Sequence, residues 1–187
     1  MGSNKTVFFI IGILIVVLGI SMLIPYAIQI IYNENSHSFL SSSFITIVLG
    51  VLFILTNLEK EFKLNLQQTF LFSSLAWFLV AMFGSIPFLL SPSNLSFSDA
   101  FFESMSGVTT TGATVINDLD NSPKSLLLWR ALTQWLGGIG IVVMAITILP
   151  LLKVGGMQLF KMEGPDAAEK ILPRTIEVAK VIIIIYL

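Results

Sequence analysis

Apolar residues in this sequence fall into long runs that are separated by short polar segments. In the first half of the chain these runs are residues 7–31, 44–58 and 70–90. About 20 apolar residues, each adding about 1.5 Å along a helix, cross the roughly 30 Å hydrocarbon core of a bilayer. The runs predict three membrane-spanning helices, of which the second reaches membrane length only if Phe39 and Leu40 belong to it.

A secretory signal peptide is the competing interpretation of the first run. Such a peptide has a shorter apolar region, of about 7–15 residues, and ends in a cleavage site of small residues. The run over residues 7–31 is longer and no such site follows it, so we expect it to remain as a spanning helix. Pro25 removes one backbone N–H from this helix and predicts a kink.

The second half combines one more long apolar run with a short helical segment. Ser96 and Asp99 form a pattern typical of a helix start, which predicts a helix over residues 97–107. That helix is too short to span a bilayer. A fourth long helix is expected over residues 125–152. The short helix and the loop after it therefore stand between two spanning helices.

The composition places the chain in a membrane. Its 187 residues are 55% hydrophobic and only 11% charged, whereas about a quarter of the residues in a soluble domain are charged. We expect an all-α integral membrane protein in contact with the lipid bilayer. The 10 basic residues are scattered and form no basic face with interleaved aromatic residues, which excludes nucleic acid as a partner.

The sequence carries little of the chemistry that catalysis needs. It contains no cysteine, and its one histidine, His37, stands alone in a polar loop and is interpreted as solvated. We find no cluster of His, Asp and Glu and no Gly-rich phosphate-binding loop along the chain. We therefore expect neither an enzyme nor a bound cofactor.

A run of threonine and glycine follows the short helix. In potassium channels a Thr-Val-Gly-Tyr-Gly loop points backbone carbonyls at a dehydrated cation, and glycine supplies dihedral angles that side chains resist. Residues 110–114 follow that pattern in order, with Thr for Val, Ala for Tyr and Thr for the second Gly. The predicted potassium-facing carbonyls are those of Thr110, Thr111, Gly112 and Ala113, with Thr109, Thr114 and Gly107 as support.

An ordinary Thr- and Gly-rich turn is the alternative interpretation of this loop. The membrane context argues against it, because unsatisfied backbone groups in hydrocarbon cost several kcal/mol each. A polar loop between spanning helices must be buried in protein or line water. The negative end of the short helix, near Gly107, also favours a cation beside the loop.

Acidic residues are expected on the same side of the membrane as this loop. They would raise the local cation concentration at an outer mouth, and the alternative is a solvated loop surface. These residues are Asp99, Glu103, Asp118 and Asp120.

Arg130 stands in the fourth long apolar run, where a charge seeks a partner. We expect it to form a structural ion pair with Glu103 or Asp99. Extension of its side chain to the outer interface is the alternative.

Lysine and arginine residues predict the orientation. If the four long helices alternate in direction, most of the lysine and arginine residues lie on one side of the membrane, and only Lys124 and Arg130 lie near the other side. The positive-inside rule then places the N-terminus in the cytoplasm and lets the short helix enter from outside. The shared side carries Lys5, Lys60, Lys63, Lys153, Lys161, Lys170 and Arg174.

Three ordered motifs resemble the TrkH branch of the Trk/Ktr/HKT potassium transporter superfamily. They are residues 103–114 (ESMSGVTTTGAT), residues 129–140 (WR followed by QWLGGIG) and residues 155–160 (GGMQLF). The similarity runs from about Phe70 to the end of the chain, and residues 7–58 correspond to the extra N-terminal helix pair of TrkH-type members. The resemblance implies potassium transport in a bacterial cell (inner) membrane. It also implies four concatenated helix–pore helix–filter loop–helix repeats around one pore, a homodimer, and a cytoplasmic nucleotide-binding regulatory subunit.

The expected organisation has four parts. Residues 1–65 form the N-terminal helix pair, 66–152 the first repeat, 153–175 a cytoplasmic linker, and 176–187 the truncated start of a second repeat. With one filter loop where four are needed, we interpret the chain as an N-terminal fragment whose remaining repeats belong to the same polypeptide. A single-repeat tetrameric cation channel and a non-conducting structural membrane subunit are the alternatives.

Overall fold

The computed structural model of the chain describes residues 4–34, 36–58, 64–93 and 95–152. Within these ranges all regular elements are helices, which confirms the all-α prediction. The predicted linker at 153–175 and the predicted start of a second repeat at 176–187 lie outside the described residues. All contacts described below lie within the compact unit formed by residues 1–134.

The first apolar run forms two helices, α1 (Lys5–Ser21) and α2 (Leu23–Ile31), which meet at Met22. Pro25 explains the interruption, because it has no N–H to donate to the carbonyl four residues earlier, at Ser21. The second run forms α3 (Ser38–Thr56), which includes Phe39 and Leu40 and so reaches membrane length.

The third run forms α4 (Leu66–Gly84) and the short α5 (Ile86–Leu89), with a break just before Pro87. The start of α4 lies four residues before the predicted one. Asn65 and Gln68 account for the difference, because each side chain accepts a hydrogen bond from the other residue's backbone N–H. The remaining helices are α6 (Phe97–Val108) and α7 (Lys124–Leu152).

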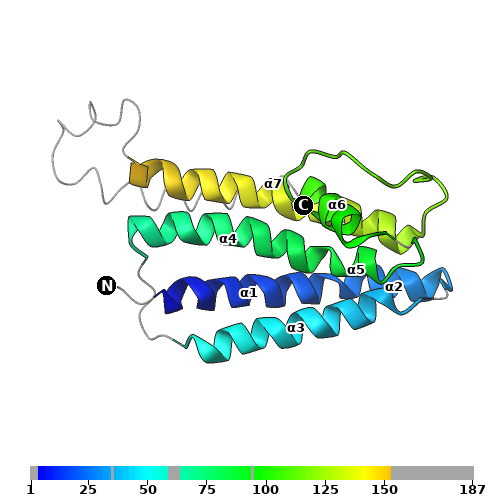
Figure 1. Ribbon diagram of the computed structural model, residues 1–187, viewed down its shortest axis with the longest axis horizontal. Helices are drawn as coiled ribbons and strands as arrows, with labels where there is room; N and C mark the ends of the chain where they lie inside the picture. Colours follow the sequence, from blue (N-terminus) through cyan, green and yellow to red (C-terminus); the bar gives the residue numbers. More distant parts are fainter. Residues whose placement is uncertain (1–3, 35, 59–63, 94, 153–187) are drawn as a thin grey trace. The chain divides into compact units, whose positions relative to one another are not determined.

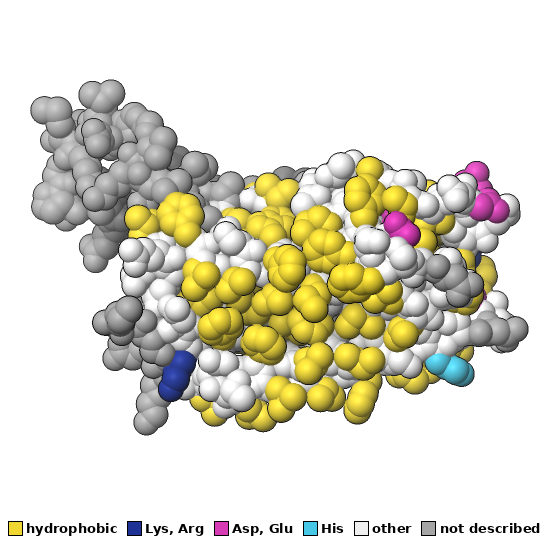
Figure 2. Space-filling model, in the orientation of Figure 1, with side chains coloured by type: hydrophobic (Ala, Val, Ile, Leu, Met, Phe, Trp, Pro, Cys, Tyr) yellow, Lys and Arg dark blue, Asp and Glu magenta, His cyan; other side chains and the backbone are white. Residues whose placement is uncertain are grey.

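Four helical segments are long and apolar enough to cross a membrane, as the sequence predicts. They are Lys5–Ile31, Ser38–Thr56, Leu66–Leu89 and Lys124–Met144. Many large apolar side chains on them are exposed, and Figure 2 shows hydrophobic side chains covering the middle of one face. An apolar surface of this extent suits contact with lipid rather than with water.

Helices α1 and α3 lie side by side (Figure 1) and approach closely at glycine residues. A Cβ atom at Gly50 would stand 2.8 Å from the Cγ2 atom and 2.9 Å from the backbone nitrogen of Val16. Along the same pair of helices, the Ser43 hydroxyl donates to the carbonyl of Gly19 at 2.7 Å. Small residues and hydroxyl groups are the usual means by which membrane helices associate.

We predict that Gly50→Ala destabilises the α1–α3 pair, because the added methyl group has no space between the two backbones. The expected cost is about 1–3 kcal/mol, typical of overpacking. Thermal unfolding in detergent micelles measures it as a lowered midpoint. Leu49→Ala is the matched control on the same helix, since Leu49 is 37% exposed. Equal midpoints for the two variants would contradict the role of Gly50.

Candidate ion-selectivity filter

Helix α6 begins and ends close to the predicted positions. At its start, the Ser96 hydroxyl accepts from the backbone N–H of Asp99 and donates to the Asp99 carboxylate at 2.7 Å. The helix has 12 residues, which makes it about 18 Å long and too short to cross a bilayer. Helix α6, labelled in Figure 1, packs against α4 and α5.

The end of α6 is a left-handed turn with two characteristic hydrogen bonds. Thr110 donates its backbone N–H to the carbonyl of Gly107, and Thr111 donates to that of Ser106, each at 2.9 Å. Thr110 stands at the position of this motif that usually holds glycine, with φ at +59°. A β-branched residue is strained there by an amount on the order of 1–3 kcal/mol.

Gly112 has a φ of +76°, a conformation of the kind that side chains resist and that the comparison with channel filters predicts. A side chain at this position would be strained, whereas glycine adopts the conformation freely. The sequence predicts unusual dihedral angles at Gly112 but not the left-handed conformation of Thr110. The two left-handed residues, on either side of Thr111, turn the chain sharply at the end of α6.

The backbone amides of the loop point back towards α6. Those of residues 109–112 donate to the carbonyls of Met105, Gly107 and Ser106, at distances of 2.9–3.3 Å. In a planar trans peptide the carbonyl of the preceding residue points the opposite way. The carbonyls of Thr109, Thr110 and Thr111 are therefore directed away from the helix, as three consecutive acceptors.

Side chains hold the outer half of the loop. The Ser106 hydroxyl donates to the carbonyl of Ala113 at 2.6 Å, so this carbonyl turns towards α6 and retains one further lone pair. The hydroxyl of Thr114 and the backbone N–H of Val115 both donate to Oε1 of Glu103, at 2.5 Å each. Glu103 thus binds two consecutive residues of the loop.

The second oxygen of the Glu103 carboxylate accepts from Nε of Arg130 at 2.9 Å. The Glu103 residue is only 1% exposed. Of the two carboxylates considered for Arg130, the structure brings Glu103 to it, while Asp99 binds Ser96 at the start of α6. Because the ion pair joins α6 to α7, it fixes these two helices beside the loop.

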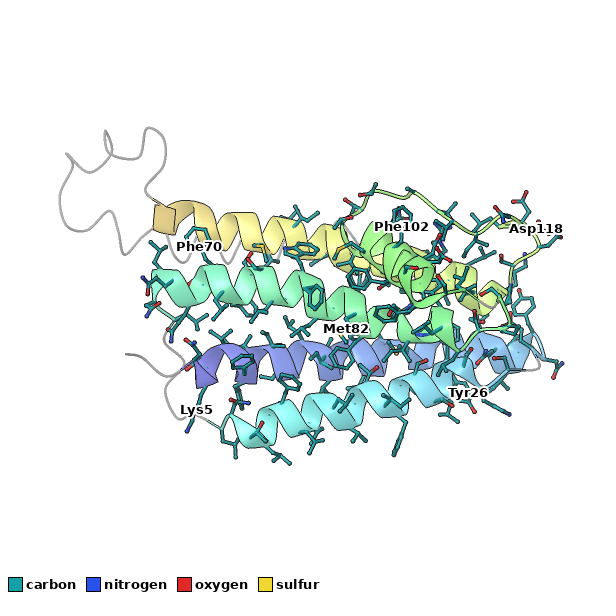
Figure 3. All side chains as sticks on the ribbon, viewed as in Figure 1. Lys5, Tyr26, Phe70, Met82, Phe102 and Asp118 are labelled. Atoms are coloured by element: carbon teal, nitrogen blue, oxygen red, sulfur yellow. The ribbon has the colours of Figure 1, made fainter. Side chains whose placement is uncertain are left out.

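The other acids lie in more open positions. Asp118 and Asp120 are exposed, and Asp118 accepts from the side chain of Asn121. Figure 3 shows Asp118 at the opposite end of the helices from Lys5. Asp99 is half-buried. Glu103, grouped with these acids in the sequence analysis, is buried and supports the loop instead.

Several residues at the site escaped the sequence analysis. One is Ser106, whose hydroxyl binds the loop. Two others, Thr133 and Gln134, belong to α7. A Cβ atom at Gly107 would overlap the side chain of Thr133, and a Cβ atom at Gly112 would stand 3.0 Å from Nε2 of Gln134. The QWLGGIG motif contains Gln134, but nothing in the sequence indicates which residue faces the loop.

A further contact missed from sequence joins the N-terminal helix pair to α7. The Glu34 carboxylate accepts from the backbone N–H of Ser125 at 3.2 Å and from its hydroxyl. A carboxylate at a helix N-terminus is favoured by the free N–H groups and by the helix dipole. The loop between α2 and α3 thereby anchors the start of α7.

Known proteins resemble this chain in sequence and in fold. The Trk system potassium uptake protein TrkH of Escherichia coli (strain K12) is 40% identical over 181 residues, which covers 95% of this chain and 38% of that protein. The TrkH of Vibrio parahaemolyticus serotype O3:K6 is 39% identical over 187 residues, covering 98% of this chain and 39% of that protein. The chain therefore spans less than two fifths of the length of these relatives.

A solved structure agrees with these matches. The crystal structure of the potassium transporter TrkH from Vibrio parahaemolyticus matches with a TM-score of 0.83 and 35% identity, over 99% of this chain and 37% of that one. The family described as TrkH, cation transport protein, matches residues 35–187. This match includes α3, the short helix α6, the loop after it and α7. The chain belongs to the TrkH family of cation transport proteins.

Proposed function

We propose that this chain supplies the first helix–pore helix–filter loop–helix repeat of a potassium uptake transporter, with residues 109–114 as one wall of the selectivity filter. The observation that carries the proposal is the direction of the carbonyls of Thr109, Thr110 and Thr111, away from α6, with the adjoining amides bound to it. A cation that leaves water needs oxygen ligands of this kind.

The electrostatics of α6 support the same function. The helix ends at the loop, so the negative end of its dipole lies beside the carbonyls and favours a cation there. The buried ion pair of Glu103 and Arg130 is nearly neutral as a unit. The exposed carboxylates of Asp118 and Asp120 attract cations towards the mouth, and so does the half-buried carboxylate of Asp99 in the first turn of α6.

Potassium is the proposed cargo because the matched relatives are named potassium uptake proteins. One loop supplies one side of each ring of carbonyls, so the pore needs three more, which we assign to further repeats of the same polypeptide. By family resemblance we add a homodimer and a cytoplasmic nucleotide-binding regulatory subunit. No cofactor is proposed beyond the transported potassium ion.

We place the protein in the bacterial cell membrane as a multi-pass protein with a cytoplasmic N-terminus. The supporting observation is the separation of charge, since Lys5 and Asp118 lie at opposite ends of the helices (Figure 3). Basic residues favour the cytoplasmic side. The loop after α6 then faces the outside of the cell.

We predict that Gly112→Ser in the complete protein lowers the preference for potassium over sodium. A side chain at φ +76° is strained, and relief of that strain shifts the neighbouring carbonyls. The expected loss in the potassium-to-sodium uptake ratio is on the order of tenfold, the effect of about 1.4 kcal/mol. The measurement is uptake of both ions at matched membrane abundance.

Asn33→Ser is the matched control for this variant. Asn33 is also left-handed, with φ at +49°, but it lies in the loop between α2 and α3. Serine tolerates this region less well than asparagine, so it adds backbone strain there without touching the candidate filter, and the uptake ratio is expected to stay at the wild-type value. A wild-type ratio for Gly112→Ser would remove this loop from the filter.

The proposed orientation is tested by single cysteine substitutions, because the chain has no cysteine of its own. Asn4→Cys and Asn121→Cys place thiols at exposed positions before α1 and before α7. In right-side-out membrane vesicles we expect a membrane-impermeant maleimide to label Asn121→Cys at once, and Asn4→Cys only after permeabilisation. The reverse pattern would invert the orientation.

A further inference from the structure

We propose that the Glu103 carboxylate positions the outer half of the candidate filter, holding Thr114 and Val115 with one oxygen while Arg130 of α7 holds the other. This positioning role rests on the proposed function, because it concerns the same loop. In this role Glu103 not only pairs with Arg130 across two helices but also fixes the position of the loop.

The inner and outer halves of the loop are held by different means. Residues 109–112 are held by their own amides against the carbonyls of α6, and these bonds depend little on side chains. Beyond Gly112 the described hydrogen bonds from α6 to the loop come from side chains, those of Ser106 and Glu103. A change at Glu103 therefore acts on the outer half while the inner half keeps its backbone support.

Burial makes the Glu103 contacts strong. The residue is 1% exposed, and a buried carboxylate without partners is expensive. Three donors meet it at 2.5, 2.5 and 2.9 Å, and the guanidinium of Arg130 balances its charge. Hydrogen bonds to a charged acceptor are roughly twice as strong as neutral ones. Arg130 and the two loop donors thus hold the carboxylate from opposite sides, and the carboxylate fixes the loop.

This contact also gives a physical reason for Thr114. The potassium-channel pattern has glycine at this place, and threonine reduces the freedom of the backbone. Here the threonine hydroxyl supplies one of the two loop donors to Glu103. The loop loses backbone freedom at its outer end and gains an attachment point in exchange.

The test is Glu103→Gln in the complete protein, assayed by the potassium-to-sodium uptake ratio at matched membrane abundance. A glutamine has one acceptor oxygen and no charge, so it cannot serve both the loop and Arg130 as the carboxylate does. We expect the ratio to fall on the order of tenfold, as for the loss of a charged hydrogen-bond partner. An unchanged ratio would overturn the positioning role.

Asp99→Asn is the matched control on the same helix. It removes the same charge one turn earlier in α6, where the carboxylate binds Ser96 and not the loop. A charge at the mouth attracts potassium and sodium alike, so its loss lowers the uptake of both ions and leaves their ratio at the wild-type value. A fall equal to that of Glu103→Gln would show that negative charge at the outer side, rather than contact with the loop, sets the ratio.

Thr114→Val keeps the proposal testable if Glu103→Gln does not reach the membrane. This nearly isosteric change removes the hydroxyl that donates to Glu103 and that accepts from the backbone N–H of Ile116 at 3.0 Å, and it leaves the ion pair with Arg130 in place. We expect the ratio to shift in the same direction as for Glu103→Gln, and the double variant to be no worse than Glu103→Gln alone, because the two groups act through one contact. Additive effects would overturn the shared contact.

The Gly112→Ser result separates the two proposals. If Gly112→Ser lowers the ratio while Glu103→Gln and Thr114→Val leave it unchanged, the loop is the filter and Glu103 does not position it. If Gly112→Ser itself leaves the ratio unchanged, the proposed filter fails and the role of Glu103 fails with it.

Discussion

The backbone amides that follow a short helix placed between membrane helices need hydrogen-bond partners that hydrocarbon cannot supply, and the end of α6 supplies them. Four consecutive amides, those of residues 109–112, return to carbonyls of the last turns of the same helix. The direction of the loop carbonyls follows from these bonds, because each peptide unit is planar and trans. A row of outward acceptors is thus a consequence of how the helix end satisfies its own backbone.

This arrangement requires a left-handed backbone at two residues. Gly112 adopts it freely because it has no Cβ atom, whereas Thr110 carries a β-branched side chain in the same region and is strained. Strained residues of this kind persist where the surrounding contacts over-determine them, and such contacts concentrate at functional sites. Here the contacts come from the carbonyls of α6 on one side, while Gln134 of α7 lies against Gly112 on the other.

The remaining helices hold these two in place. The Trp129 indole, fully buried, donates to the carbonyl of Gly84 at 3.0 Å and so ties α7 to the end of α4. Glu34 reaches the start of α7 from the loop between α2 and α3. The N-terminal pair, packed through its glycines, is therefore connected to the same framework as the candidate filter.

Local pattern in the sequence determined most of the helices and part of the loop. Run length predicted the four spanning segments, and Pro25 predicted a kink in the first of them. The channel-like order of residues 110–114 predicted dihedral angles at Gly112 that side chains resist. These features depend on residues close together in the chain, through helix geometry and the dihedral limits of proline and glycine.

Only the tertiary structure decided which distant groups meet. Arg130 lies 27 residues from Glu103, and both Asp99 and Glu103 were suitable partners until α6 and α7 were packed. Ser125 lies 91 residues from Glu34, and no periodicity relates two positions so far apart. The left-handed Thr110 likewise escaped prediction, because threonine adopts that conformation only where the hydrogen bonds of the helix end hold it there.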